Sequence, residues 1–140
     1  MMKKFLKTAS VIFLFINGTG ALWGGAGLIY DPTGDYMQMP LSLLEHSPFH
    51  DYLVPGIILF IANGLFSMFV LFMMVKNHPL YARFIFLQGV ILAMWITVQV
   101  AMLQILYLPL HLPFFLVGVF LIIAGIIISA SEKTPSVKQA

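Results

Sequence analysis

The chain has no cysteine and little charge. The lack of cysteine excludes disulfides, thiolate catalysis and cysteine-ligated metal sites. Only 9% of the residues are charged and 61% are hydrophobic, whereas about 25% are charged in ordinary soluble domains. The seven Lys and Arg residues are too few to form a patch that binds nucleic acid. This composition indicates a protein that lies in a membrane.

Asp, Glu, Lys, Arg and His are absent from four long apolar stretches, residues 8–30, 53–75, 84–107 and 112–130. A hydrocarbon core about 30 Å thick needs about 20 apolar residues per helix, and lipid offers no partner for open backbone groups. The sequence therefore predicts an all-α fold, an integral membrane four-helix transmembrane bundle, as one domain over residues 1–140. Because no stretch holds one of these five residue types, proton-coupled transport and haem ligation are disfavoured, and we expect no cofactor.

Lys and Arg are missing from two of the three connections between these stretches. They precede the first stretch, separate the second from the third, or follow the fourth: Lys3, Lys4, Lys7, Lys76, Arg83, Lys133 and Lys138. The long connection, residues 31–52, carries carboxylates instead. Because positive charge in short loops stays in the cytoplasm, we expect cytoplasmic termini and a multi-pass protein of the bacterial inner membrane. The first stretch also resembles a signal peptide, but it stays apolar as far as Ile29, and we expect it to be retained as a span.

The long connection carries turn and helix signals. Asp31, Pro32 and Gly34 occupy positions that a type I turn favours. Residues 40–46 predict a short interfacial helix opened by proline. Four side chains of this region are expected to face lipid: Met37, Met39, Leu41 and Leu44.

Proline also marks the expected starts and ends of other helices. Ser47 is predicted to cap the second helix, with Pro48 as its first residue. A bend is expected in that helix near residues 55–56. Pro109 and Pro113 are expected to bound a short turn between the third and fourth helices.

Each stretch carries small or polar residues at helical spacing. In chain order they are Asn17, Gly20, Gly24 and Gly27, then Gly56, Asn63 and Ser67, then Gly89, Ala93, Thr97 and Ala101, and finally Gly118, Gly125 and Ser129. Steps of three, four and seven keep such residues on one helix face. Helices in lipid associate by close packing, which small residues permit, so these stripes are the predicted inner seams of the bundle. A stripe left facing lipid would indicate contacts in a homo-oligomer.

A run of short motifs extends along most of the chain. The motifs are Asn17-Gly18, Gly24-Gly25, Asp31-Pro32-Thr33-Gly34, Ser47-Pro48-Phe49, Pro55-Gly56, Asn63-Gly64, Gln88-Gly89, Trp95-Ile96 and Gln99. With these motifs the chain resembles a group of small uncharacterised bacterial four-helix inner-membrane proteins. The resemblance implies the fold and the membrane, and it implies no activity.

Histidines are expected on the outer face at His46, His50 and His111. Histidine together with carboxylates binds zinc or copper, which makes these three residues weak metal candidates. Pro48 interrupts any helix that would align His46 with His50, and the favoured interpretation is a solvated acidic connection without a metal. The two serines of the connection are poor nucleophile candidates, and we expect the protein not to be an enzyme.

Asn17 and Asn63 are the most polar groups near mid-membrane depth. Their helices are sequential and antiparallel, and their depths differ by roughly 4.5 Å at 1.5 Å per residue. We expect a hydrogen bond between the two, worth about 0.6–2 kcal/mol. The alternative is that these amides line a binding site.

Trp23, Trp95 and Gln99 fall in the outer halves of the first and third helices. Together with Asn63 they would border an amphipathic pocket beneath the long connection, which would act as its lid. A bound amphiphile would place its polar end near Asn63 or His50.

The predicted function is binding of a membrane lipid, a hydrophobic small molecule or a membrane protein partner. The alternative is an oligomeric channel or facilitator lined by Asn and Gln side chains. The small-residue stripes distinguish the two hypotheses, because a single bundle that buries every stripe leaves no lining for a pore.

Overall fold

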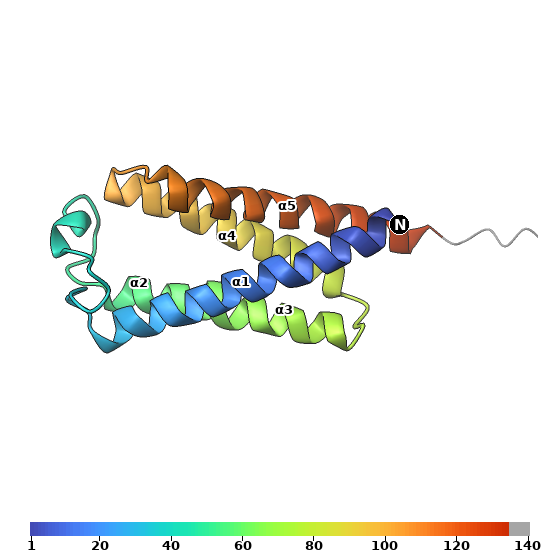
Figure 1. Cartoon of the computed structure of the whole chain (residues 1–140), viewed down its shortest axis with the longest axis horizontal. Coiled ribbons are helices and arrows are strands. Elements are labelled where there is room, and N and C mark those ends of the chain that lie inside the picture. The colour runs from blue at the N-terminus through green and yellow to red at the C-terminus, as the bar shows by residue number, and fades with distance from the viewer. Residues whose placement is uncertain (135–140) are drawn as a thin grey trace, which may run out of the picture.

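The computed structural model describes residues 1–134, and every long element in them is helical (Figure 1). The elements in chain order are α1 (Met2–Tyr30), the 3-10 helix η1 (Leu41–Leu44), α2 (Leu53–Ile58), the π-helical η2 (Leu59–Leu65), α3 (Phe66–Val75), α4 (Tyr81–Leu103) and α5 (Leu108–Lys133). α2, η2 and α3 form one continuous second span. The described residues hold four helices that are long and apolar enough to cross a membrane, so the predicted all-α, multi-pass fold is confirmed.

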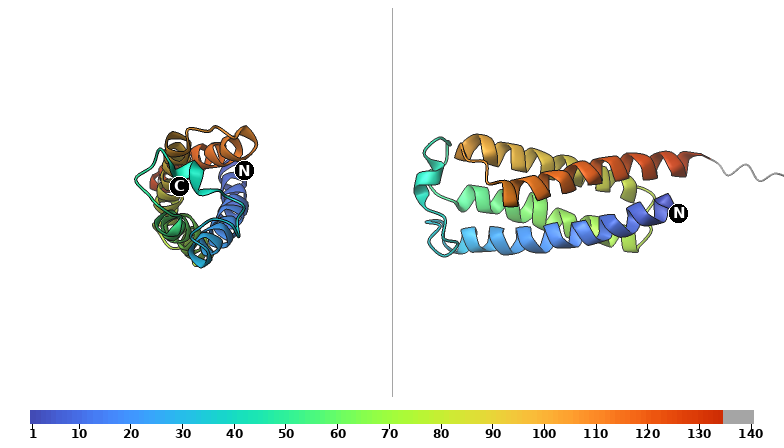
Figure 2. Two further views of the ribbon diagram at one scale, coloured as in Figure 1. Left: turned by 90° about the vertical axis from the view of Figure 1, so that its left-hand side faces the viewer. Right: turned by 45° about the horizontal axis from the view of Figure 1, so that its top comes forward.

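Successive spans run in opposite directions, which gives the molecule two different ends (Figures 1 and 2). One end, here called the loop end, carries the connections 31–52 and 104–107. The other end, here called the basic end, carries the N-terminus, the connection 76–80 and the end of α5. All described Lys and Arg residues lie toward the basic end: Lys3, Lys4, Lys7, Lys76, Arg83 and Lys133. Lys138 lies outside the described residues.

α4 and α5 pack closely because glycines form their contact. A Cβ added at Gly89 would lie 2.6 Å from the backbone nitrogen of Ile122, and one at Gly125 would lie 2.6 Å from the Cβ of Phe86. Gly118 extends this contact toward the loop end, where a Cβ would meet the Ala93 backbone nitrogen at 3.0 Å and the Gly89 carbonyl oxygen at 3.1 Å. The predicted seam of the fourth stripe is therefore confirmed at Gly118 and Gly125.

α1 packs against the second span in the same way, although the seam was predicted on the wrong face. A Cβ at Gly25 would lie 2.7 Å from the backbone nitrogen of Phe60, and one at Gly56 would lie 2.8 Å from the Cβ of Leu28. At Gly20 a Cβ would meet nothing within 4 Å. The buried face of α1 includes Asn17, Gly18, Ala21, Gly25 and Leu28. Only Asn17 and Gly27 of the predicted stripe are fully buried.

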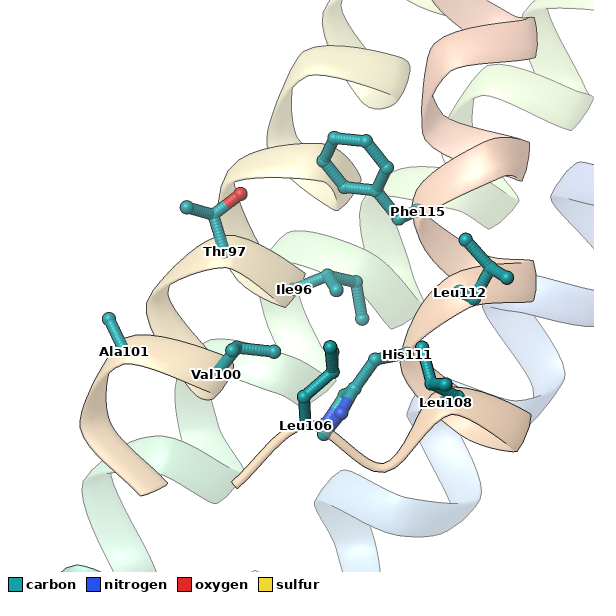
Figure 3. Close-up of a pocket in the computed structure, with 9 residues that line it drawn as sticks. All are labelled: Ile96, Thr97, Val100, Ala101, Leu106, Leu108, His111, Leu112 and Phe115. Atoms are coloured by element: carbon teal, nitrogen blue, oxygen red, sulfur yellow. The ribbon is translucent and has the colours of Figure 1, made fainter. Parts of the chain in front are cut away.

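The third stripe is buried only in part. Gly89 is buried and Ala93 contacts Gly118, but Thr97 and Ala101 are exposed. Toward the loop end a hollow of about 430 Å³ lies between α4 and α5 and includes Thr97 and Ala101 in its lining (Figure 3). The predicted seam was wrong there because the two helices do not meet along their whole length.

The main hydrophobic core fills the half of the bundle nearer the basic end. It consists of Leu6, Leu14, Val70, Met74, Tyr81, Ala82, Ile85, Leu121, Ala124 and Ile128. A separate, smaller cluster of Leu28, Leu44 and Tyr52 lies at the loop end, with Met37, Met39 and Phe49 packed against it. The expectation that Leu44, Met37 and Met39 face lipid was therefore wrong, because the connection folds inward over the helix ends. Leu41 is exposed, as expected.

The second helix begins at Leu53, so its predicted start at Ser47 and Pro48 was wrong. The Ser47 hydroxyl donates to the Leu44 carbonyl at 2.9 Å and accepts the Phe49 N–H at 3.2 Å, which forms a local turn. The Asp51 carboxylate accepts the Leu53 N–H at 2.9 Å instead.

The turn predicted between Pro109 and Pro113 is also wrong, because α5 already begins at Leu108. Pro109 lies in the first turn of α5, where its missing N–H would be unpaired anyway, and Pro113 lies inside the helix. α4 ends at Leu103, and its C-cap Gln104 has a left-handed φ of 54°. The connection between these helices is therefore residues 104–107.

Candidate functional site

A cavity of about 270 Å³ lies at the loop end, beneath the long connection. α1, the second span, the connection and α4 all contribute to its wall. The lining consists of Gly24, Leu28, Met37, Met39, Leu44, Pro48, Phe49, Tyr52, Pro55, Ile58, Leu59, Trp95, Val98, Gln99, Met102 and Leu103. The wall contains no ionisable group other than the Tyr52 phenol.

Tyr52 holds the connection over the cavity. Its side chain is 2% exposed, and its hydroxyl donates to the Pro40 carbonyl at 2.9 Å. The Tyr52 N–H donates to the Pro32 carbonyl at 2.9 Å. Burial raises the pKa of the Tyr52 phenol above its ordinary value. A neutral tyrosine therefore joins the beginning and the middle of the connection to the start of the second span.

The predicted turn at Asp31–Gly34 forms the other support of the connection. The Gly34 N–H donates to the Asp31 carbonyl at 3.1 Å, and the Gly34 φ of 84° lies in the left-handed region that favours glycine. The Asp31 carboxylate accepts the Thr33 hydroxyl at 2.6 Å and the Tyr36 N–H at 2.9 Å. These hydrogen bonds, that of the Thr33 side chain foremost, hold the pKa of Asp31 below its usual value.

The chemistry of the cavity is apolar, with Gln99 as its one side-chain amide. Within residues 1–134 the Gln99 carboxamide has no hydrogen-bond partner in the protein. The Trp95 and Phe49 side chains offer aromatic surface in the same wall. Apolar walls with a few polar groups that fix orientation are typical of small-molecule sites.

The structure brings together two of the residues proposed for this pocket and separates the others from it. Trp95 and Gln99 line the cavity. Trp23 is 66% exposed and its ring lies 6.5 Å from that of Tyr36, as in an aromatic belt at a membrane surface. His50 is exposed and does not line the cavity.

Asn17 and Asn63 meet in the middle of the bundle, but not through their two side chains. The Asn17 amide donates to the Ser67 hydroxyl at 3.0 Å and, more weakly, to the Asn63 backbone carbonyl at 3.4 Å. The Asn63 side-chain oxygen accepts from the Gln88 amide at 3.2 Å. Asn17, Asn63, Ser67 and Gln88 thus form a polar centre, and all four residues are buried.

Two atoms of this polar centre lack a partner among the described residues, Asn63 Nδ2 and Gln88 Oε1. The Ser10 hydroxyl, nearer the basic end, also lacks one. Asn63 belongs to the π-helical segment η2, and π-helical turns are rare and frequently found at functional sites. Leu59 opens that same segment and lines the cavity, so η2 joins the cavity to the polar centre.

The sequence predicted Asn17 as the side-chain partner of Asn63, whereas the structure shows that this partner is Gln88. Its position inside a stretch without charged residues was a usable signal, because an amide within a membrane span needs a partner. Choosing Asn63 as that partner requires the relative rotation of α4 and the second span, which no local pattern gives.

The three histidines do not come together. His46 and His50 are exposed. His111 was predicted in the short turn between the third and fourth helices, but it is buried in the first turns of α5. Its Nδ1 accepts the Tyr107 N–H at 3.0 Å, so the ring satisfies a backbone donor at the helix start. His111 also borders the hollow between α4 and α5 (Figure 3). The described residues hold no group of three or more metal-ligating side chains.

Comparisons of the chain with family models, with curated proteins and with solved structures found no match. The candidate site therefore rests on its own geometry.

Proposed function

We propose that this four-span membrane protein binds an uncharged hydrophobic small molecule or a lipid tail in the cavity beneath the long connection, and that it does so without catalysis. The observation that carries the proposal is the apolar cavity beneath the connection, whose one side-chain amide, Gln99, has no hydrogen-bond partner within residues 1–134. An apolar guest would lie against Trp95 and Phe49, and a single carbonyl or hydroxyl group on it would reach Gln99. A charged guest is disfavoured because no opposite charge lines the wall.

The proposed location is the inner membrane of a bacterium, with the basic end in the cytoplasm. Lys and Arg are retained on the cytoplasmic side during insertion, and all that are described lie toward one end. The cavity would then open toward the outer leaflet.

The channel alternative is less well supported. It needs Asn17, Asn63 and Gln88 to line an open path, whereas these side chains are at most 3% exposed and two hydrogen bonds between side chains join them and Ser67. Replacing those bonds with water would require the second span to leave both α1 and α4.

Two glycines on α1 provide a matched test of the cavity. Gly24 lines it and has room for a Cβ, whose nearest neighbour would be a Leu59 methyl group at 3.5 Å, whereas Gly20 faces away into open space. Protein purified in mild detergent should carry a hydrophobic ligand that native mass spectrometry detects. We expect Gly24→Leu to deplete the ligand by filling the cavity and Gly20→Leu to leave it in place.

A second pair tests the aromatic wall. Trp95→Ala removes a lining side chain, and Trp23→Ala removes an exposed one. Ligand loss in the first variant alone supports the proposal. Equal ligand content in all four variants, or no ligand in the wild-type protein, would overturn it.

A further inference from the structure

A second groove lies at the opposite end of the molecule, on the outer surface where α4 meets α5. Its volume is about 520 Å³. Arg83 and Phe86 of α4 form one wall, and Gly125, Ser129 and Lys133 belong to the other wall on α5. This groove is separate from the cavity beneath the long connection.

Helical spacing explains why these side chains share one groove. Arg83 and Phe86 are three residues apart, and Gly125, Ser129 and Lys133 follow one another at steps of four, so each set lies on one helix face. Gly125 brings α5 against the backbone of Phe86, which closes the floor of the groove. A cation from each helix thus lies at the end of an apolar trough.

Neither cation of the groove has a counter-charge among the described residues, where the one ion pair joins Lys3 to Glu132. Glu132 is the one described carboxylate at the basic end, and it turns away from the groove. It pairs with Lys3 at 3.2 Å and accepts the Tyr81 hydroxyl at 2.7 Å. Within residues 1–134 Arg83 and Lys133 have neither an ion pair nor a side-chain hydrogen bond.

We propose that this groove binds an anionic phospholipid of the leaflet at the basic end. The lipid phosphate lies between the Arg83 guanidinium and the Lys133 ammonium, where charge-assisted hydrogen bonds are strong. The Ser129 hydroxyl adds a donor, and an acyl chain follows Phe86 and Gly125 toward the membrane centre. Lys133 and Gly125 are eight residues apart, about 12 Å along the helix, so the groove extends from headgroup depth into hydrocarbon. Basic pockets between transmembrane helices on the cytoplasmic side bind such headgroups.

The apolar part of the groove favours a lipid over free phosphate. A soluble anion would use only the two cations and would leave the Phe86 and Gly125 surface to other lipids. The full site matches a molecule that carries both a phosphate and a tail.

The test is lipid retention by the full chain. Protein is reconstituted into vesicles of equal parts phosphatidylglycerol and phosphatidylcholine, extracted in mild detergent, and its bound lipids are counted by native mass spectrometry. We expect the wild-type protein to retain phosphatidylglycerol preferentially. The Arg83→Gln/Lys133→Gln variant should lose that preference by about tenfold or more, since each basic group near an anionic surface contributes about 1 kcal/mol.

The matched control removes the same charge from the same end. Lys4 and Lys76 are exposed and lie outside the groove, so Lys4→Gln/Lys76→Gln should keep the preference. A third variant, Ala130→Trp, fills the groove without changing its charge and should also release the lipid. Equal losses in both charge variants, or a wild-type protein without preference, would overturn the proposal. So would displacement of the lipid by millimolar inorganic phosphate, because that result would show that the tail contributes nothing.

Discussion

The two ends of this bundle are built differently although the same four spans run through both. Toward the basic end, ten buried residues form one core, and Lys3, Glu132 and Tyr81 tie the helix ends together. Toward the loop end, the buried cluster has three members and lies beside a cavity. Packing energy is therefore concentrated in one half, and the other half keeps space for a guest.

The polar centre marks the boundary between the halves. Asn63 and Gln88 lie between the cavity at the loop end and most of the core at the basic end, and neither side chain is exposed. A low local dielectric strengthens such bonds and also makes an unpaired partner costly. The hydrogen bonds of the polar centre thus select which faces of the helices meet, independently of the packing at the loop end.

The largest expected effect concerns which side of the membrane each end faces. The chain has no cysteine, so single cysteines can be introduced at Thr33, Gln104 and Asn77, all exposed. An impermeant thiol reagent applied from outside should label the first two and not the third. Labelling at Asn77 from outside would reverse the assignment of the two ends.

The next largest effect is expected from overpacking the seam between α4 and α5. Gly89→Leu forces a side chain against the Ile122 backbone, and overpacking of this kind costs about 1–3 kcal/mol or more. Gly20→Leu, which meets open space, should stay within about 0.5 kcal/mol of the wild type. Unfolding in detergent measures both variants. Equal stability of the two would show that the seam tolerates bulk.

A smaller change in the free energy of unfolding is expected at the polar centre. Asn63→Leu leaves the buried Gln88 amide without its partner, at a cost of about 1–3 kcal/mol. Asn63→Leu/Gln88→Leu removes both groups and should recover part of that loss. In a double-mutant cycle the coupling should be about 0.5–1.5 kcal/mol. Purely additive losses would mean that the two amides do not interact.

The smallest effect is expected at the loop end. Tyr52→Phe removes the hydrogen bond to the Pro40 carbonyl, which is worth about 0.5–1.5 kcal/mol. The phenol pKa is raised in the folded state, so its contribution is complete below a pH of about 10 and is lost as the pH rises through the folded-state pKa. Hydrogen exchange over residues 31–52 should quicken in the variant at neutral pH. Above the folded-state pKa the protection of these amides, corrected for the base-catalysed increase in intrinsic exchange, should fall in the wild type to that of the variant, and a persistent difference there would contradict this account.

The sequence predicted the spans and the separation of charge because both depend on lengths and residue types alone. It misplaced the seam of α1 because glycines occur on more than one face, and only the position of the second span selects Gly25 over Gly20. Ser47-Pro48 gave a strong helix-start signal, but the connection continues to Leu53 because Asp51 provides another start. Trp23 and Trp95 are the same residue type and both fall in the outer half of a helix, so nothing in the local sequence shows that only Trp95 faces the cavity.

The glycine contacts described above also bear on how the protein is made. They join α1 to the second span and α4 to α5, that is, neighbours in the order of synthesis. Contacts between these two helical hairpins include the polar bonds Asn63–Gln88 and Lys3–Glu132. Each hairpin can therefore close from neighbouring spans, and the Lys3–Glu132 pair between the hairpins can form only once α5 has been made. A chain cut within residues 76–80 should accordingly reassemble from two separately inserted halves.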